Sequence, residues 1–415
     1  MRATEFPNFN RNTKQRVCKY SYKPLKALLM LFLLDFRGQS AHNLCSILRS
    51  TVIVSAITFI QVYSFYFKIT RMTAKVIASI RITDTVQMIF DYCQYLIDLF
   101  FVHKYGQDVS IEYSKQYDRI DGIMGMSYYP NLKQRMKKVI LLFMFVWMTI
   151  TTCDFVAWAL AFGWFISLIY AVNFIFLLIK MTTILDLTYQ VSNIEIRLQM
   201  IADAVQQYCV STACVSDLIG DPTSNKKWLY NEGYLGKKLN RPEPLTVFTR
   251  SLDDPKWLNR CYLLLLEQCA FINHVYGVRI LLNSLSLLID MVRFINLGVR
   301  VLIGTQHVMY ENTCFPIISS IMKAAACAFI LVVLVYYCER AYRQGDRVIS
   351  LIDHLLVTKC PKDALRSSMQ ELRNLVQSRP IDFHLAFFFR LNYALLISIA
   401  SVVSTYTIIL LQSPD

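Results

Sequence analysis

The sequence predicts an all-α membrane protein with seven transmembrane helices, cytoplasmic extensions of those helices, an N-terminus inside the cell and a C-terminus outside. One observation behind this prediction is composition: 55% of the 415 residues are hydrophobic, 17% are charged and the mean hydropathy is +0.38. Soluble domains typically carry about 25% charged residues. The other observation is that apolar residues gather in runs of about 20, the length of a helix that crosses a bilayer.

Seven apolar runs satisfy this length rule. They cover residues 46–67, 83–104, 138–158, 162–186, 278–302, 315–338 and 384–411. We group them as helices 1–4 (46–186), helices 5 and 6 (278–338) and helix 7 (384–412). The third and fourth runs are joined by the short stretch "WALAFGW", whose Trp158 and Trp164 suit the membrane interface.

Basic residues predict the orientation, because Lys and Arg accumulate in the cytoplasmic segments of membrane proteins. The basic polar segments are 1–45, 105–137, 187–277 and 339–383. An exception is the stretch after the first run, which would lie outside although it contains Lys68, Arg71, Lys75 and Arg81. We attribute the net charge of +14 to this topology and expect no nucleic-acid partner. The first 45 residues lack the apolar core of a cleaved signal peptide.

The cytoplasmic segments are predicted to be helical rather than loops. Residues 189–208 continue the fourth span with apolar positions at mostly helical spacing, and residues 257–279 lead into the fifth. Leu365, Met369, Leu372 and Val376 form a stripe at i, i+4, i+7 and i+11. Helices with one apolar face each should pack together, so we expect a helical anchor region from 187–277 and 339–383. Residues 218–244, rich in Gly, Pro and Asn, are predicted to be a mobile loop within it.

The last span carries a polar face. Ser401, Thr405, Ile408 and Gln412 fall at i, i+4, i+7 and i+11, on one side of a helix. Hydrogen bonding between helices by Ser and Thr is a common reason for such a face. Gln412, near the outer end, favours a water-filled path, because an amide facing lipid would lack a hydrogen-bonding partner.

The end of the chain resembles the insect gustatory receptors. Their last span carries a Thr-Tyr pair, five apolar positions, a Gln and usually a Phe; here Thr405 and Tyr406 precede five residues and then Gln412. This chain has Ser413 in place of the Phe. The resemblance extends to the preceding residues 387–404 and, in architecture, to the whole chain.

The resemblance implies a ligand-gated, non-selective cation channel in the plasma membrane of sensory neurons. Four copies, identical or combined with other gustatory receptors, would surround a pore lined by the last helix. Gln412 would sit at the constriction, with Ser413 beside it. Thr405 and Tyr406 would pack within the surroundings of this helix. Residues 413–415 would form an extracellular tail. Insect odorant receptors share this architecture, so an odorant-receptor-type subunit is the alternative.

The resemblance also implies a pocket for a small-molecule tastant in the outer half of the bundle. Candidates there are polar or aromatic: Gln87, Phe90, Asp91, Asp154, Trp158, Trp164, Tyr170 and Asn296. Aromatic side chains in a bundle are more often packing residues. An intramembrane Asp instead marks a functional polar site or an ion pair. Asp290 and Arg293, at i and i+3, are predicted to form a structural pair.

Other classes of membrane protein fit less well. A G-protein-coupled receptor has its N-terminus outside, and the "DRI" at 118–120 precedes the third span here instead of ending it. A transporter remains an alternative, but the halves of the chain show no internal repeat. An enzyme is disfavoured, because His103, His274 and His384 are dispersed and no hydrolase motif is present. The 12 cysteines have no metal-ligand spacing, so we expect neither metal nor cofactor.

Overall fold

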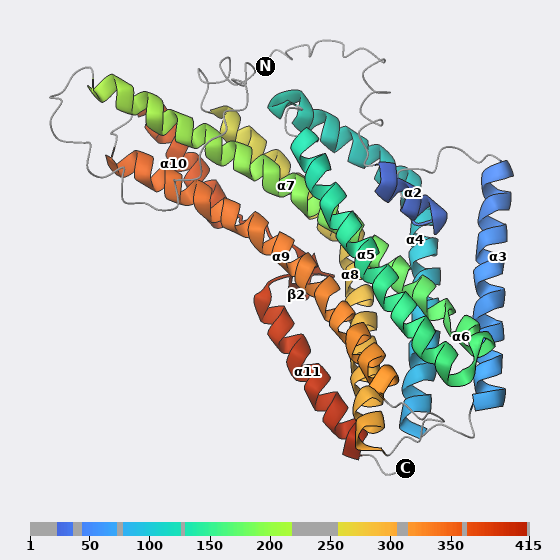
Figure 1. Ribbon diagram of the computed structural model, residues 1–415. Helices are drawn as coiled ribbons and strands as arrows, with labels where there is room; N and C mark the ends of the chain where they lie inside the picture. Colours follow the sequence, from blue (N-terminus) through green and yellow to red (C-terminus); the bar gives the residue numbers. More distant parts are fainter. Residues whose placement is uncertain are drawn as a thin grey trace.

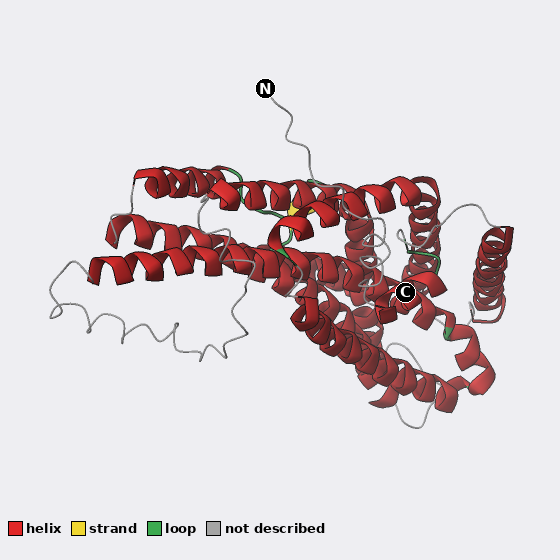
Figure 2. Cartoon of the chain, turned by 90° about the horizontal axis from the view of Figure 1, so that it is seen from above, coloured by secondary structure: helices red, strands yellow, loops and turns green. Residues whose placement is uncertain are grey.

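The computed structural model describes residues 23–35, 44–72, 78–125, 129–217, 256–304, 314–358 and 363–412. Almost all of the described chain is helix (Figure 2). The elements in chain order are α2 (Lys23–Leu31), α3 (Leu44–Phe67), the π-helix η2 (Lys68–Met72), α4 (Ala78–Met124), α5 (Tyr129–Phe162), α6 (Trp164–Tyr170), α7 (Val172–Asp217), α8 (Lys256–Ile303), α9 (Cys314–Thr358), α10 (Asp363–Ser378), β1 (His384–Leu385), β2 (Phe389–Arg390) and α11 (Tyr393–Gln412). The predicted mobile loop 218–244 and the tail 413–415 lie outside the described residues.

Several helices are much longer than a membrane span. The 46 residues of α7 extend roughly 70 Å, more than twice the hydrocarbon thickness of a bilayer, which is about 30 Å. Helices α7 and α9 run side by side toward the end of the molecule that contains α10 (Figure 1). We call this the α10 end, and the opposite end, where α11 finishes, the Gln412 end. The segments 187–217 and 339–358 are therefore continuous with α7 and α9.

Five of the described helices are long and apolar enough to cross a membrane, judged by length and composition. The qualifying segments are Leu48–Thr70, Pro130–Leu160, Ser167–Cys209, Phe315–Thr358 and Tyr393–Gln412. Helices α4 and α8 are not among them. Both carry charged side chains in the stretches that the sequence analysis places in the membrane, and they pack against each other. Membrane-depth charges require partners of this kind.

The α10 end has a polar core. Arg197 of α7 is fully buried; its Nη2 pairs with Asp121 of α4 at 2.7 Å, and its Nη1 donates to Gln268 of α8 at 2.6 Å. Its guanidinium also lies over the ring of Tyr117. Burial raises the pKa of Tyr117 well above its ordinary value, so the hydroxyl stays neutral and donates to Gln190. These contacts fix the registers of three long helices relative to one another.

Helix α10 covers this end with the apolar stripe that its sequence predicts. Met369, Leu372 and Val376 are buried and Leu365 is half-buried against the core. The opposite face of α10 is exposed.

The last span begins later than predicted. The sequence predicted helix from residue 384, but α11 begins at Tyr393, and residues 384–390 form a two-stranded hairpin. Its turn places Ala386 (φ 47°) and Phe387 (φ 66°) in the left-handed region, which a right-handed helix cannot contain. The apolar run predicts a helix, but contacts from other helices hold its backbone in the hairpin instead.

Two side chains hold the backbone at the start of the hairpin. Asn273 of α8 donates from Nδ2 to the carbonyl of Asp382 at 2.7 Å and accepts from the amide of His384 at 3.1 Å. The hydroxyl of Tyr342 on α9 likewise contacts both the amide and the carbonyl of Phe383. The hairpin is thereby fixed to α8 and α9, and it sets the position at which α11 starts.

A glycine allows the hairpin to approach α8 closely. A Cβ built on Gly277 would lie 3.0 Å from the amide nitrogen of Ala386 and 3.3 Å from its Cα. Both neighbours are backbone atoms, so they cannot swing aside as a side chain would. A side chain at residue 277 would therefore require the hairpin to move by a few tenths of an ångström away from α8.

We predict that Gly277→Ala destabilises the protein, because the hairpin must shift by a few tenths of an ångström against its hydrogen bonds to Asn273 and Tyr342. The measurement is the temperature at which half of the purified, detergent-solubilised protein leaves its monodisperse chromatographic peak, which should fall by several degrees. Gly345→Ala on α9 is the matched control, because nothing lies within 4 Å of its built Cβ. Alanine there should be neutral or stabilise the helix by up to about 1 kcal/mol. Equal midpoints for the two variants would contradict the close-contact interpretation.

Candidate functional site

Helix α11 has one face on the bundle and one face away from it. Val403 and Thr407 are buried, and Leu395, Ile399 and Leu410 pack partly against α8 and α9. The predicted polar face lies on the other side: Ser401, Thr405, Ile408 and Gln412 are all exposed. Tyr406 is 55% exposed next to this face. A single chain therefore leaves the stripe without a covering element among the described residues.

The hydroxyls on the exposed side of α11 are satisfied within the helix. Thr405 donates to the carbonyl of Ser401 at 2.9 Å, Ser404 to that of Ala400 and Ser398 to that of Ala394. Such bonds allow Ser and Thr to face an apolar or a wet environment. The amide of Gln412 has no such local bond among the described contacts and is the most polar group of the stripe. Ser413 lies outside the described residues.

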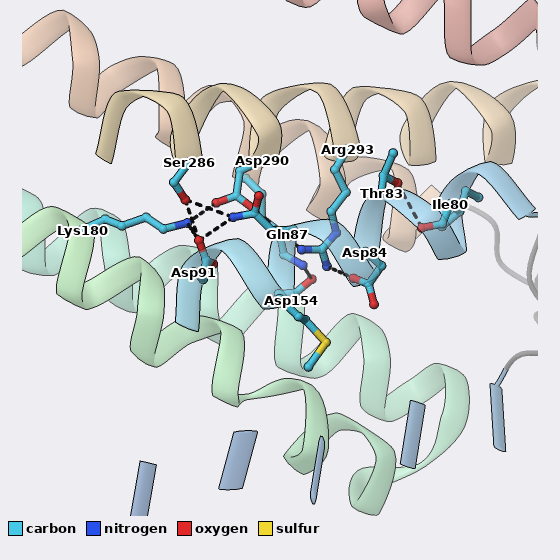
Figure 3. Close-up of polar contacts among 12 residues, drawn as sticks. Ile80, Thr83, Asp84, Gln87, Asp91, Asp154, Lys180, Ser286, Asp290 and Arg293 are labelled. Carbon is cyan, nitrogen blue, oxygen red and sulfur yellow. Dashed lines mark hydrogen bonds and ion pairs between the residues drawn. The ribbon is translucent and has the colours of Figure 1, made fainter. Parts of the chain in front are cut away.

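A second polar arrangement lies inside the bundle, where α4, α7 and α8 meet (Figure 3). The ammonium of Lys180 on α7 lies 2.8 Å from Asp91 of α4 and 2.6 Å from Asp290 of α8. Ser286 of α8 and Gln87 of α4 donate to the same carboxylate of Asp91, at 2.5 and 2.7 Å. All five side chains are buried. One lysine thus joins three helices through two carboxylates.

The arrangement continues one turn along α8 toward the Gln412 end. Arg293 pairs with Asp84 of α4 at 2.6 Å, while its distance to Asp290 is 3.7 Å. The predicted Asp290–Arg293 pair is therefore present but is the longer of two contacts. Asp84 also pairs with Lys68 of η2 at 3.1 Å. Lys68 is therefore buried and paired with a carboxylate. One of the four basic residues in the stretch that disagreed with the predicted orientation is thus an interhelical partner and not a free loop charge.

A third group joins α5 and α9. Asp154 is 2% exposed and lies 2.5 Å from the ammonium of Lys323. It also accepts hydrogen bonds from Ser319 on α9 and from the indole of Trp158 on α5. The ring of Phe294 on α8 has the Lys323 ammonium 4.9 Å from its centroid and the Arg293 guanidinium 5.0 Å from it. This ring therefore contacts a cation from each of the two groups of charges.

We call the residues in the contacts of Lys180, Arg293 and Asp154 together the interhelical network. Its charged members are the acids Asp84, Asp91, Asp154 and Asp290 and the bases Lys68, Lys180, Arg293 and Lys323. Four negative and four positive charges cancel. Burying an unpaired charge is far more costly than burying a paired one, and removing one partner of a buried pair costs about 3 to 5 kcal/mol. The network therefore dictates which helices can be neighbours.

The eight residues predicted to form a ligand pocket are distributed unevenly. Gln87, Asp91, Asp154 and Trp158 belong to the interhelical network, and Phe90 is half-buried on α4. Trp164 is 69% exposed on α6. Asn296 is buried on α8 but contacts Arg300. Tyr170 lies outside the residues whose side chains the structure describes.

The sequence predicted Arg293 as a paired base and placed Lys68 in an outer stretch, but the other two bases of the network, Lys180 and Lys323, were not among the predicted site residues. Lys180 stands within the apolar stretch "FLLIKMTT", and a lysine at membrane depth is itself a signal of a buried partner. Asp84 lies at the start of the apolar run 83–104, where a charge is taken for the boundary of the span, and Lys323 lies inside the run 315–338. Their partners are distant in sequence: 110 residues separate Lys180 from Asp290.

The long helices, the buried charge pairs and the exposed polar stripe together describe a multi-pass membrane protein. The sequence model of the 7tm chemosensory receptor family matches residues 29–413. The chain therefore belongs to this family of receptors, which are of the insect gustatory and odorant type.

Solved structures agree with this assignment at the level of the fold. The insect olfactory receptor OR5 from Machilis hrabei in complex with eugenol superimposes with a TM-score of 0.57 and 14% sequence identity, covering 96% of this chain and 99% of that chain. A second structure of the same receptor gives a TM-score of 0.56 with the same identity and coverage. No curated protein sequence matches the chain.

We predict that the pair Asp154–Lys323 behaves as a unit. Lys323→Met leaves the buried Asp154 carboxylate without its cation, so delivery of the protein to the cell surface should fall severalfold, as expected for a loss of about 3 to 5 kcal/mol. The double variant Lys323→Met/Asp154→Asn removes both charges and keeps an acceptor for Trp158 and Ser319, so surface delivery should largely recover. Surface biotinylation measures both. A double variant no better than Lys323→Met alone would contradict the charge-balance explanation.

Proposed function

We propose that the protein is a gustatory receptor: a ligand-gated, non-selective cation channel that a small-molecule tastant opens. Four copies, or this chain with related subunits, surround a pore lined by α11. The observation that carries the proposal is the stripe Ser401, Thr405, Ile408 and Gln412, which is exposed on the side of α11 away from its own bundle. In a fourfold assembly this stripe faces the axis, and Gln412 forms the constriction with Ser413 beside it.

The proposal includes seven spans, with the N-terminus inside and the C-terminus outside. It adds α4 and α8 to the five helices that qualify by apolarity. Their charges support this count, because Asp84 and Asp91 of α4 face partners on α7, α8 and η2. A charged helix is compatible with a bilayer when its charges face other helices.

The tastant is proposed to bind beside the interhelical network, in the outer half of the bundle. Gln87 supports this location: it is 1% exposed, and its Oε1 has no hydrogen-bonding partner among the described residues. Trp158 adds a half-buried aromatic surface next to Asp154. A ligand with a hydrogen-bond donor and an aromatic or alicyclic body suits these groups.

An odorant-receptor-type channel is the second candidate. It is favoured by the similarity of the fold to OR5, an olfactory receptor. The pattern Thr405, Tyr406 and Gln412 favours the gustatory type instead.

Current recording tests the function. Cells expressing the protein should give cation currents on application of at least one compound from a panel of bitter substances and sugars, with reversal near 0 mV in mixed sodium and potassium solutions. Responses to volatile odorants alone would favour the second candidate. Substrate uptake without ionic current would favour a transporter. Single-particle images with fourfold symmetry would test the assembly independently.

We predict that Gln412→Arg strongly reduces the evoked cation current. Four arginines in one narrow ring would repel permeating cations electrostatically. The measurement is agonist-evoked sodium current normalised to surface protein, which should fall at least tenfold, as expected for a charge ring at a constriction.

Gln412→Asn is the matched control, because it keeps an uncharged amide at the same position and should retain current. A wild-type current in a surface-expressed Gln412→Arg variant would remove Gln412 from the permeation path.

A further inference from the structure

An arginine of α8 holds the last turn of α11. The Nη2 of Arg300 donates to the carbonyl oxygen of Leu410 at 2.8 Å, and its Nε donates to Asn296 at 3.3 Å. Arg300 is only 4% exposed although it carries a full charge. The carbonyl of Leu410 is one of the last four of α11, which have no partner within the helix. The contact therefore satisfies a backbone group that the helix itself leaves open.

The directions of the two helices explain why a cation is needed there. Helix α8 ends at Ile303 and α11 ends at Gln412, both at the Gln412 end (Figure 1). Each helix C-terminus carries roughly half a negative charge. Two such ends side by side repel each other, and the single positive charge of Arg300 offsets both.

The same face of α8 leads back to the interhelical network. Asp290, Arg293, Asn296 and Arg300 are spaced by three, three and four residues and are all buried. This spacing keeps them on one side of the helix. A shift or rotation of α8 at Asp290 therefore moves Arg300 as well, because the helix between them is continuous.

We infer that Arg300 is a positioning residue for the pore, which keeps the outer end of α11 drawn toward α8 in the conducting state. The inference rests on the proposed channel function. Leu410 is two residues from Gln412, and the face of α11 that packs on α8 and α9 is opposite the exposed stripe. A hydrogen bond on that peripheral side pulls the four Gln412 residues apart and opposes narrowing of the constriction.

The first test replaces the donor. Arg300→Met keeps a long side chain but removes the charge and every donor, so the open–closed equilibrium constant at saturating agonist should fall roughly tenfold, the size expected for a hydrogen bond to a charged group. Arg300→Lys keeps the charge and should recover part of the loss. Single-channel recording gives open probability separately from the number of channels at the surface.

The second test weakens the acceptor without changing any side chain. Incorporating the α-hydroxy analogue of leucine at position 411 turns the amide that contains the Leu410 carbonyl into an ester, which is a poorer acceptor. Open probability should fall in the same direction as in Arg300→Met, and the two changes combined should be no worse than Arg300→Met alone. The α-hydroxy analogue of valine at position 403 is the control, because it also removes one helical N–H but affects a carbonyl that Arg300 does not contact.

The outcomes separate the inference from the function on which it rests. Absence of current from the unmodified protein with every agonist would count against the channel itself. A conducting protein whose open probability is unchanged or raised by Arg300→Met would overturn the inference, as would independent, multiplying effects of Arg300→Met and the ester at 411. If Arg300→Met fails to reach the surface, the ester experiment decides alone, because all side chains remain native.

Discussion

The architecture depends on the ion pairs that Lys180 makes with Asp91 and Asp290. Charged groups buried among apolar helices are tolerated only with partners, and this lysine has one partner on each of two other helices. It therefore determines that α4, α7 and α8 meet at one depth and in one rotational setting. Helix α8 in turn carries Asn273, Gly277 and Arg300, the residues that contact the segment around α11. The position of the last helix is thus a consequence of charge pairing elsewhere in the bundle.

Helix α11 is fixed at its two ends and packed only lightly between them. Its start is determined by the hairpin on α8 and α9, and its end by the contact of Arg300 with Leu410. Between these points only Val403 and Thr407 are buried. A helix supported in this way can tilt without losing much apolar contact with its own subunit. The proposed function as a gated pore needs such a helix.

The sequence located most of the long helices but few of their partners. The predicted fourth span, 162–186, is divided between the end of α5, α6 and the start of α7. Apolar runs located the long helices because span length and apolarity are local properties, and the stripe from Leu365 to Val376 gave the buried face of α10. The spacing of Asp290 and Arg293 indicated a pair, but the shorter contacts of both residues are to other helices. The apolar run "FFF" at 387–389 predicts helix where the structure has the hairpin 384–390. The hydrogen bonds from Asn273 and Tyr342 that hold the hairpin come from distant helices, so no local pattern indicates them. Tertiary polar contacts of this kind leave no periodicity in the sequence.

The neutrality of the interhelical network has an electrical consequence. Work done by the membrane potential on a moving part of a protein is proportional to the net charge that it carries across the field, about 2.3 kcal/mol per charge per 100 mV. The four acids and four bases of the network sum to zero, so a joint displacement of these eight side chains carries no net charge of their own across the field. In the proposed channel, the network itself therefore contributes little to any dependence of gating on the membrane potential.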